Sequence, residues 1–211
     1  STVDLTVKQD TEPGQYIIDS EQGETIPDTG DLITENKVKF AGGSGTLYDP
    51  YQIENAEQLN LIRDDLDACY ILTKDIDLND LTVAGEVYDD GRGWLPIGTG
   101  DEPFTGIFDG NGRIIKNLYI NRNDEYYVGL FGFVELGYIY NLGLENVNVT
   151  CMNVTGGLAG VNSGVVLNCY VTGEVRGSES LNDYVYVGGL VGSNVGILED
   201  SYSSAVVECG D

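Results

Sequence analysis

Short apolar stretches alternate with glycines in the second half of the chain, and the same arrangement occurs three times. Each copy contains a leucine between glycines, at 129–132, 157–160 and 189–192, so the copies begin 28 and 32 residues apart. A further glycine follows each copy, then an aliphatic residue two positions on, and an Asn or Asp two positions beyond it. A period in this range is typical of a solenoid, because one unit cannot bury its apolar face until a neighbour stacks on it.

The repeated units contain β-branched residues and lack a helical period, which predicts an all-β fold, a right-handed parallel β-solenoid over residues 43–209. Equivalent positions of successive coils should stack about 4.8 Å apart. Asn141, Asn168 and Asp200 would then form a ladder at one corner. The aliphatic residues expected to face inward in columns are Leu130, Leu158, Leu190, Ile139, Val166 and Leu198.

The N-terminal part has a different pattern. Val3, Leu5 and Val7 alternate with polar residues, as in an amphipathic β-strand, and two later apolar runs at 16–18 and 32–33 are separated by turns with Pro and Gly. We therefore expect a β-rich, extended arm or cap over residues 1–42 and a solenoid domain over residues 43–211. An amphipathic strand without a partner in its own chain would have to pair elsewhere.

A short amphipathic helix is expected over residues 55–66. Asn55 and Gln58 have the spacing of a capping box, and Leu59, Ile62 and Leu66 follow at helical spacing. The helix is expected to cover the N-terminal end of the solenoid, because repeat proteins need capped ends. A direct functional role for this helix is the alternative.

The Gly-Leu-x-Gly segments resemble the GLUG repeat of bacterial and archaeal surface proteins. The resemblance is close for three coils at 127–209 and looser over 43–120, which includes the segments 49–53, 94–98 and 104–112. It implies an adhesin-like β-solenoid located outside the cell or on its surface. The same repeat is associated with the N-terminal regions of IgA1-specific zinc peptidases, but the motif itself contains no catalytic residue.

The charge balance is strongly acidic, with 35 Asp and Glu against 10 Lys and Arg and a formal net charge of −25. Such a chain has no basic face for phosphates, so nucleic acid is excluded as a partner and acidic lipid is disfavoured. The acids indicate either solubility in a salty or extracellular setting or binding of divalent cations. No membrane-spanning segment is expected, because no run of about 18 apolar residues occurs. The N-terminus also lacks a leader pattern, so a signal peptide has been removed or the sequence begins downstream of one.

The sequence contains no histidine, which removes imidazole bases and His-based zinc sites. Carboxylate-based glycoside chemistry needs acids that converge on one face, whereas the repeated coils place Asn, Tyr, Ser and Thr at equivalent positions. We therefore expect no enzymatic activity and no catalytic residues in this chain.

Calcium is the one cofactor that the sequence suggests. The polar segment 79–93 and the residues after it supply Asp89, Asp90 and Asp101, whose oxygens suit a hard cation. A solvated loop is the alternative, because the spacing of an EF-hand loop is missing.

Four cysteines include no C-x-x-C pair, which argues against a zinc site. Cys151 and Cys209 occupy equivalent positions two coils apart, about 9.6 Å from each other and too far for a disulfide. Cys69 and Cys209 are therefore candidates for disulfides with other chains. Asn148 and Asn153 lie in N-x-T sequons and are candidate glycosylation sites.

These observations predict a non-enzymatic structural protein of the cell surface that self-associates through its open ends and edges into a fibre, sheath or surface layer. The candidate assembly residues are Val3, Leu5 and Val7 near one end and Val206 and Val207 near the other. Copies of the chain are the expected partners, with cell-surface glycans and host or neighbouring surface proteins as further candidates. One alternative is an auxiliary binding module of a larger surface enzyme, such as a peptidase or polysaccharide-degrading enzyme. Another is truncation, in which further repeats or another domain cover the last coil.

Overall fold

The computed structural model of the chain describes residues 6–9, 16–19, 39–80, 91–178 and 185–209. The chain divides into two compact units, Ser1–Lys37 and Val38–Asp211. The predicted division at residue 42 lies close to this boundary. Residues 41 and 42 belong with the second unit, because the Ala41 amide donates to the Gln52 carbonyl at 2.9 Å and Gly42 pairs with Gln52.

The first unit contains two antiparallel strands, β1 (Thr6–Gln9) and β2 (Tyr16–Asp19), with Val7 opposite Ile18. The expectation that the amphipathic N-terminal strand lacks a partner in its own chain is therefore wrong for β1. Only six residues separate the two strands, and they include the turn-forming pair Pro13 and Gly14, so the next apolar run along the chain can pair locally. Val3 and Leu5 lie outside the described residues.

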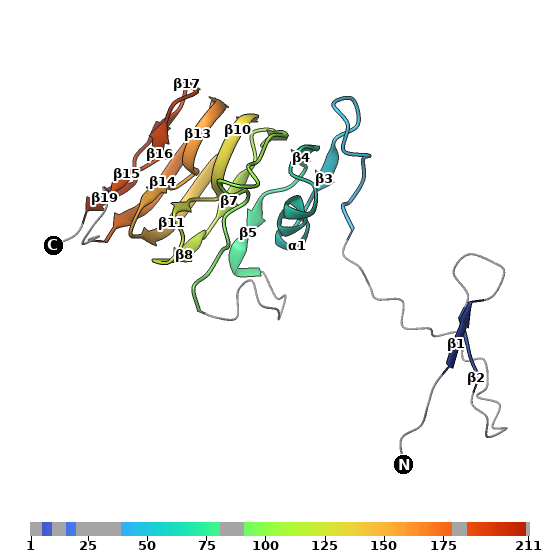
Figure 1. Cartoon of the computed structure of the whole chain (residues 1–211). Coiled ribbons are helices and arrows are strands. Elements are labelled where there is room, and N and C mark those ends of the chain that lie inside the picture. Colours follow the sequence, from blue (N-terminus) through green and yellow to red (C-terminus); the bar gives the residue numbers. More distant parts are fainter. Residues whose placement is uncertain (1–5, 10–15, 20–38, 81–90, 179–184, 210–211) are drawn as a thin grey trace, which may run out of the picture. The chain divides into compact units, whose positions relative to one another are not determined.

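The second unit is a parallel β-solenoid with two long sheets and a short third one, as Figure 1 shows. The first sheet contains β3 (Tyr51–Ile53), β4 (Cys69–Leu72), β6 (Ile107–Asp109), β10 (Phe131–Tyr140), β13 (Ala159–Leu167), β16 (Val191–Asn194) and β17 (Ile197–Glu199). The second contains β5 (Ile76–Asp77), β7 (Ile114–Lys116), β8 (Tyr119–Asn121), β11 (Gly143–Cys151), β14 (Tyr170–Gly177), β18 (Tyr202–Ser203) and β19 (Val206–Cys209). The third contains β9 (Tyr127–Val128), β12 (Val154–Gly156) and β15 (Tyr186–Gly188). The predicted all-β parallel solenoid is confirmed.

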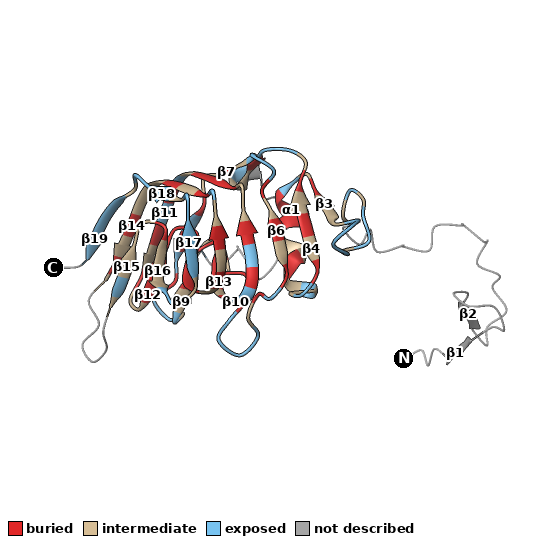
Figure 2. Ribbon diagram, turned by 90° about the horizontal axis from the view of Figure 1, so that it is seen from above, coloured by how far each residue is buried: buried red, intermediate tan, exposed pale blue. Residues whose placement is uncertain are grey.

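Apolar side chains stack in columns inside the solenoid, because paired strands keep equivalent residues in register. One column, through Tyr70, Phe108, Ile139, Val166 and Leu198, is set by four successive strand pairings. Its members are fully buried until the last coil. The leucines of the repeated motif are buried too, as predicted for Leu130, Leu158 and Leu190. In Figure 2 buried residues dominate the inner strands, whereas β17 and β19 are exposed.

Asparagine ladders hold two corners of the coils. Asn168 Nδ2 donates to Asn141 Oδ1 at 2.8 Å, and Asn141 Nδ2 donates to Asp109 Oδ1 at 3.3 Å. Asn141 and Asn168 both have a left-handed backbone, with φ of 57° and 50°, which asparagine tolerates better than most residues. A second ladder, which the repeat pattern did not predict, runs from Asn146 through Asn117 to Asp77, with N···O distances of 2.6 and 2.7 Å.

A glycine column lies between the predicted aliphatic and leucine columns. A Cβ atom on Gly164 would lie 2.2 Å from the carbonyl oxygen of Gly137, and one on Gly196 would lie 2.1 Å from that of Gly164. These positions need glycine because the backbones of successive coils approach too closely for a side chain.

The N-terminal end of the solenoid is covered by the chain itself. The predicted helix forms as α1 (Ala56–Asn60) and continues as the 3-10 helix η1 (Leu61–Asp64), so its α-helical part is shorter than expected. The 3-10 helix η2 (Leu78–Asp80) follows β5. Asn55 Oδ1 caps α1 by accepting from the Gln58 amide at 2.9 Å, and Leu59 and Ile62 are buried. Phe40 stacks on Tyr51 at 4.4 Å and continues the inner column outward.

Replacing Leu158 by Asp tests the inward column. The substitution places an unpaired carboxylate in a fully buried position, which costs several kcal/mol. We expect Leu158→Asp to lose cooperative thermal unfolding, measured by circular dichroism. Leu136→Asp is the matched control, because Leu136 is 77% exposed and should tolerate the change. Equal melting curves for both variants would contradict the alignment of the repeats.

Replacing Asn168 tests the corner ladder. Asn168→Gly keeps the left-handed backbone and loses one hydrogen bond, worth about 1 kcal/mol. Asn168→Ala loses the same bond and adds backbone strain of about 1 kcal/mol, since alanine disfavours a positive φ. Urea unfolding should therefore rank the wild type above the glycine variant and the glycine variant above the alanine variant. An alanine variant as stable as the glycine variant would show that the backbone conformation at this corner is unimportant.

Candidate functional site

The last described coil, residues 191–209 and named here the C-terminal coil, exposes side chains that its predecessors bury. Leu198 pairs in register with Val166, and Val207 with Val175, yet Leu198 is 37% exposed and Val207 46%, whereas Val166 and Val175 are buried. Leu198 keeps its predicted place in the column but is not buried, because no residue that the structure describes stacks on its outer side. This coil therefore exposes Leu198 and Val207, which continue the buried apolar columns of the preceding coils.

The polar ladders also reach this surface. Asn162, which is fully buried, donates through Nδ2 to Asn194 Oδ1 at 2.7 Å, and Asn194 is exposed. Asp200 adopts the same left-handed backbone as Asn168, with φ of 49°. Tyr202 stacks on Tyr170 with ring centroids 5.6 Å apart and an interplanar angle of 11°. Asn194, Asp200 and Tyr202 thus lie where the equivalent residues of one further coil could stack on them.

Tyr170 shows what such stacking does to a side chain. Its hydroxyl donates to Glu145 Oε1 at 2.9 Å, and its ring occupies the space beside Gly143, where a Cβ would lie 2.5 Å from the ring. Burial and the neighbouring Glu145 carboxylate raise the pKa of Tyr170 to about 12. Gly143 occupies this position in the preceding coil because a side chain there would displace the ring.

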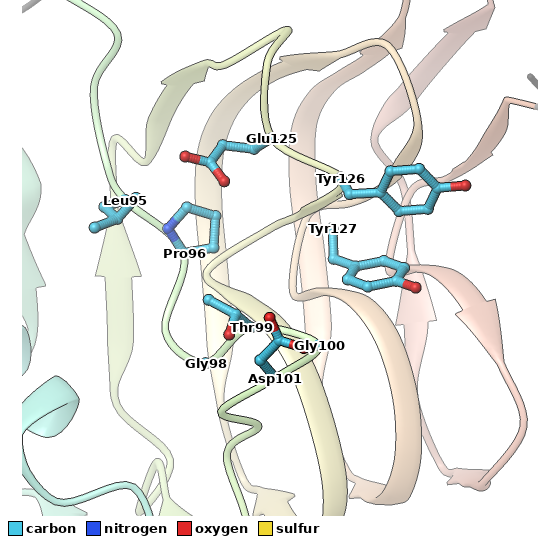
Figure 3. Close-up of a pocket in the computed structure, with 9 residues that line it drawn as sticks. All are labelled: Leu95, Pro96, Gly98, Thr99, Gly100, Asp101, Glu125, Tyr126 and Tyr127. Atoms are coloured by element: carbon cyan, nitrogen blue, oxygen red, sulfur yellow. The ribbon is translucent and has the colours of Figure 1, made fainter. Parts of the chain in front are cut away.

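A pocket of about 500 Å³ lies elsewhere on the solenoid, between the loop 95–101 and residues 125–127. Figure 3 shows its lining, with Tyr126 and Tyr127 on one side and the loop carrying Thr99, Gly100 and Asp101 facing them. The residues that line it are Leu95, Pro96, Gly98, Thr99, Gly100, Asp101, Glu125, Tyr126 and Tyr127. We call it the tyrosine pocket.

Aromatic contacts and loop hydrogen bonds hold the walls of the tyrosine pocket. Tyr127 packs edge-on against Phe133 at 5.3 Å and against Tyr126 at 5.0 Å. The facing loop is closed by two bonds, from the Thr99 amide to the Glu102 carbonyl at 2.8 Å and from the Glu102 amide to Thr99 Oγ1 at 3.0 Å. The pocket therefore keeps its shape without a ligand.

Basic side chains support the pocket from behind. Trp94 is buried, donates through Nε1 to the Leu130 carbonyl at 3.1 Å, and has the Arg63 guanidinium 4.4 Å above its ring. Arg63 also donates to the Leu95 carbonyl, and the buried Arg122 donates to the Trp94 carbonyl at 2.9 Å. These bonds hold the backbone at the base of the loop.

The predicted calcium residues are only partly described. Asp89 and Asp90 lie outside the described residues, and Asp101 is exposed at the tyrosine pocket. Among the described residues no group of three His, Cys, Asp or Glu side chains could hold a metal ion. The calcium site stays a prediction.

The cysteines lie where the repeat alignment expects them. Cys151 and Cys209 both align with Gly177, one coil on either side, and Cys151 and Cys169 are buried. All four thiols are free. Cys209 is exposed, while Cys69 in β4 is half-buried, and burial raises the pKa of the Cys69 thiol. Disulfides from Cys69 or Cys209 to other chains stay a prediction.

The two sequons differ in accessibility. Asn148 is exposed on β11, whereas Asn153 is half-buried and donates through Nδ2 to the Glu125 carbonyl at 3.3 Å. Asn148 therefore offers the freer amide, and glycosylation of either residue stays a prediction.

The two predicted assembly residues in β19, Val206 and Val207, differ in the residues they pair with. Val206 and Val207 are both exposed on β19. Val206 aligns with Glu174, which is half-buried, and Val207 aligns with the buried Val175, so Val207 is the one that extends an inner column. The sequence singled out Asp101 as a calcium candidate but not the tyrosine pocket that it lines, because the other lining residues come from irregular loops. A further signal was the tyrosine pair directly before the first repeated motif.

Comparison with known proteins finds two curated relatives that match part of this chain. No protein-family model matches it. It is 38% identical over 158 residues to halomucin of Haloquadratum walsbyi, and the match covers 72% of this chain but 2% of halomucin. It is also 41% identical over 138 residues to a protein of Evansella cellulosilytica described as a Gly-rich membrane protein, covering 63% of this chain and 15% of that protein. The chain thus spans a small part of the curated relatives that it matches, and one of the two is described as a membrane protein.

A solved structure resembles the solenoid fold of this chain. The chain resembles a crystal structure from Bacteroides ovatus assigned to an immunoglobulin A1 protease, with a TM-score of 0.54 and 25% identity over 78% of this chain and 59% of that chain. This likeness agrees with the GLUG-like repeat. None of the helices among the described residues is long and apolar enough to cross a membrane.

Calcium binding has a direct test. If Asp89, Asp90 and Asp101 bind calcium in the folded chain, millimolar calcium should raise the melting temperature, because a ligand that binds the folded state stabilises it. Magnesium is the control ion, and Asp101→Asn should reduce the shift. A melting curve that calcium leaves unchanged would remove the hypothesis.

Proposed function

We propose that this chain is a non-enzymatic structural module of an extracellular surface protein and that it self-associates by covering its C-terminal coil with that of a second copy. The single observation that carries the proposal is that Leu198 and Val207 are exposed in the last described coil, although they continue columns that the preceding coils bury. The surface or membrane-associated relatives support the location. An uncovered solenoid end with unpaired strand edges is a template for pairing with another chain.

The two ends of the solenoid differ, and this difference limits the form of the assembly. The N-terminal end is covered by Phe40 and α1, so it does not present the apolar cross-section that head-to-tail stacking needs. Two C-terminal coils can instead face each other across a two-fold axis, which gives a closed pair. A fibre, sheath or surface layer needs a second contact, and the N-terminal unit with Val3, Leu5 and Val7 is the candidate for it.

Charge opposes this pairing and makes it depend on salt. The C-terminal coil carries the exposed acids Glu199, Asp200 and Glu208, and Arg176 neutralises Glu208 through a bond of 2.8 Å. The whole chain has a net charge of −25, so two copies repel each other at low ionic strength. The apolar contact should therefore prevail when salt screens the acids.

The proposal of a non-enzymatic role rests on composition. The sequence has no histidine, and the groups that stack in the repeated coils are amides, tyrosines and apolar side chains. The alternative function, an auxiliary module of a larger surface enzyme such as a peptidase, is favoured by the likeness to the structure assigned to an immunoglobulin A1 protease. In that case further coils of a longer chain would cover Leu198 and Val207.

Self-association is tested by the molar mass in solution. We expect sedimentation of residues 1–211 to show a dimer whose dissociation constant falls at least about tenfold between about 0.01 M and 1 M salt, as the Debye length shrinks from about 30 to 3 Å. Val207→Asp should leave single subunits, because pairing would bury the new carboxylate. Leu47→Asp is the matched control, since Leu47 is 62% exposed on a turn near the other end.

Two results would contradict the proposal. One is a monomer at every salt and protein concentration, which would favour coverage of the coil by further repeats of a longer chain. The other is a Val207→Asp variant that melts and associates like the unchanged chain.

A further inference from the structure

We infer that the tyrosine pocket binds a neutral saccharide unit, through stacking on Tyr126 and hydrogen bonds to Asp101 and Glu125. The pocket has about 500 Å³, within the range of pockets that hold small ligands. This site is separate from the C-terminal coil, because its lining comes from residues 95–101 and 125–127.

Tyr126 and Tyr127 give the pocket an apolar surface. Tyr126 is 52% exposed although it lies beside the buried core, and its edge-to-face contact with Tyr127 fixes the pair at 79°. Tyr127 is held from behind by Phe133. An exposed ring with an anchored neighbour offers a flat apolar surface at low entropic cost, which suits the apolar face of a sugar ring.

Polar side chains in the lining can form hydrogen bonds with a ligand. Asp101 and Thr99 come from the facing loop, and Glu125 lies on the Pro96 side of the pocket (Figure 3). Carboxylates accept hydrogen bonds from hydroxyl donors, and the hydroxyls of Thr99 and the two tyrosines both donate and accept. A ligand that carries several hydroxyls around an apolar ring satisfies this mixture.

The charge of the lining selects among saccharides. Two carboxylates line the pocket and none of its nine lining residues is basic. A uronic or other acidic sugar would lose its hydration beside Asp101 and Glu125 without gaining an ion pair. Neutral sugars avoid this penalty, so the pocket should reject acidic polysaccharides.

The pocket is also preformed, which reduces the entropy lost on binding. Gly98 has φ of 75°, and a Cβ there would lie 2.6 Å from the Phe104 amide nitrogen and 2.8 Å from the Phe133 carbonyl oxygen. The backbone carbonyl of Glu125 accepts from the Cys151 thiol and from Asn153 Nδ2, both at 3.3 Å. Both walls are therefore fixed by the coils beneath them.

The test measures binding of defined oligosaccharides to the full chain by NMR chemical-shift changes. The neutral probes are maltotriose, chitotriose and a galactose disaccharide, and oligogalacturonate is the acidic probe. We expect at least one neutral probe to bind with a millimolar or lower dissociation constant, and we expect the acidic probe not to bind. Tyr126→Ala should weaken binding at least tenfold, and Asp101→Asn should weaken it several-fold.

Tyr48→Ala is the matched control, because Tyr48 is a 96% exposed tyrosine outside the pocket, and it should bind like the unchanged chain. Val207→Asp should also keep full binding, which separates this inference from self-association. The inference would be overturned if no neutral probe binds, or if Tyr126→Ala binds the neutral probes as tightly as the unchanged chain does.

Discussion

Each coil of this solenoid buries its apolar side chains only against the equivalent side chains of the coils beside it. Ile139 and Val166 are fully buried because Phe108 precedes them and Leu198 follows them in the same column. Close stacking also requires the glycines of the repeat, because at these positions the backbone of one coil contacts the backbone of the next. Among the described residues, Leu198 has a column neighbour on one side only, Val166, and it is 37% exposed.

Stacking places identical groups a few ångströms apart, so charge is excluded from the inside of the ladders. In both corner ladders the inner members are asparagines, and the aspartates Asp77 and Asp109 accept the last bond of each ladder. The bond from Asn117 lowers the pKa of Asp77, whereas two stacked carboxylates would each raise the pKa of the other. Among the described residues of this chain, whose net charge is −25, no Asp or Glu side chain is buried.

The sequence predicted those parts of the fold that follow from the direct repeat. The leucine column, the corner at Asn141 and Asn168, and the cap at Asn55 depend on short-range patterns that occur in register. The ladder through Asn117 and Asn146 was missed because it crosses from the irregular coils into the regular ones. The pairing of β1 with β2 was missed because an alternating strand does not identify its partner, and the tyrosine pocket because loops of unequal length bring its walls together.

We propose that the C-terminal coil is a contact surface that is covered when two copies meet. Hydrogen exchange of the backbone amides, measured by mass spectrometry at low and high protein concentration in high salt, tests it most directly. The account predicts that exchange in residues 197–209 slows as concentration rises, while exchange in 51–72 at the covered end does not change. Equal exchange of residues 197–209 at both concentrations would contradict it.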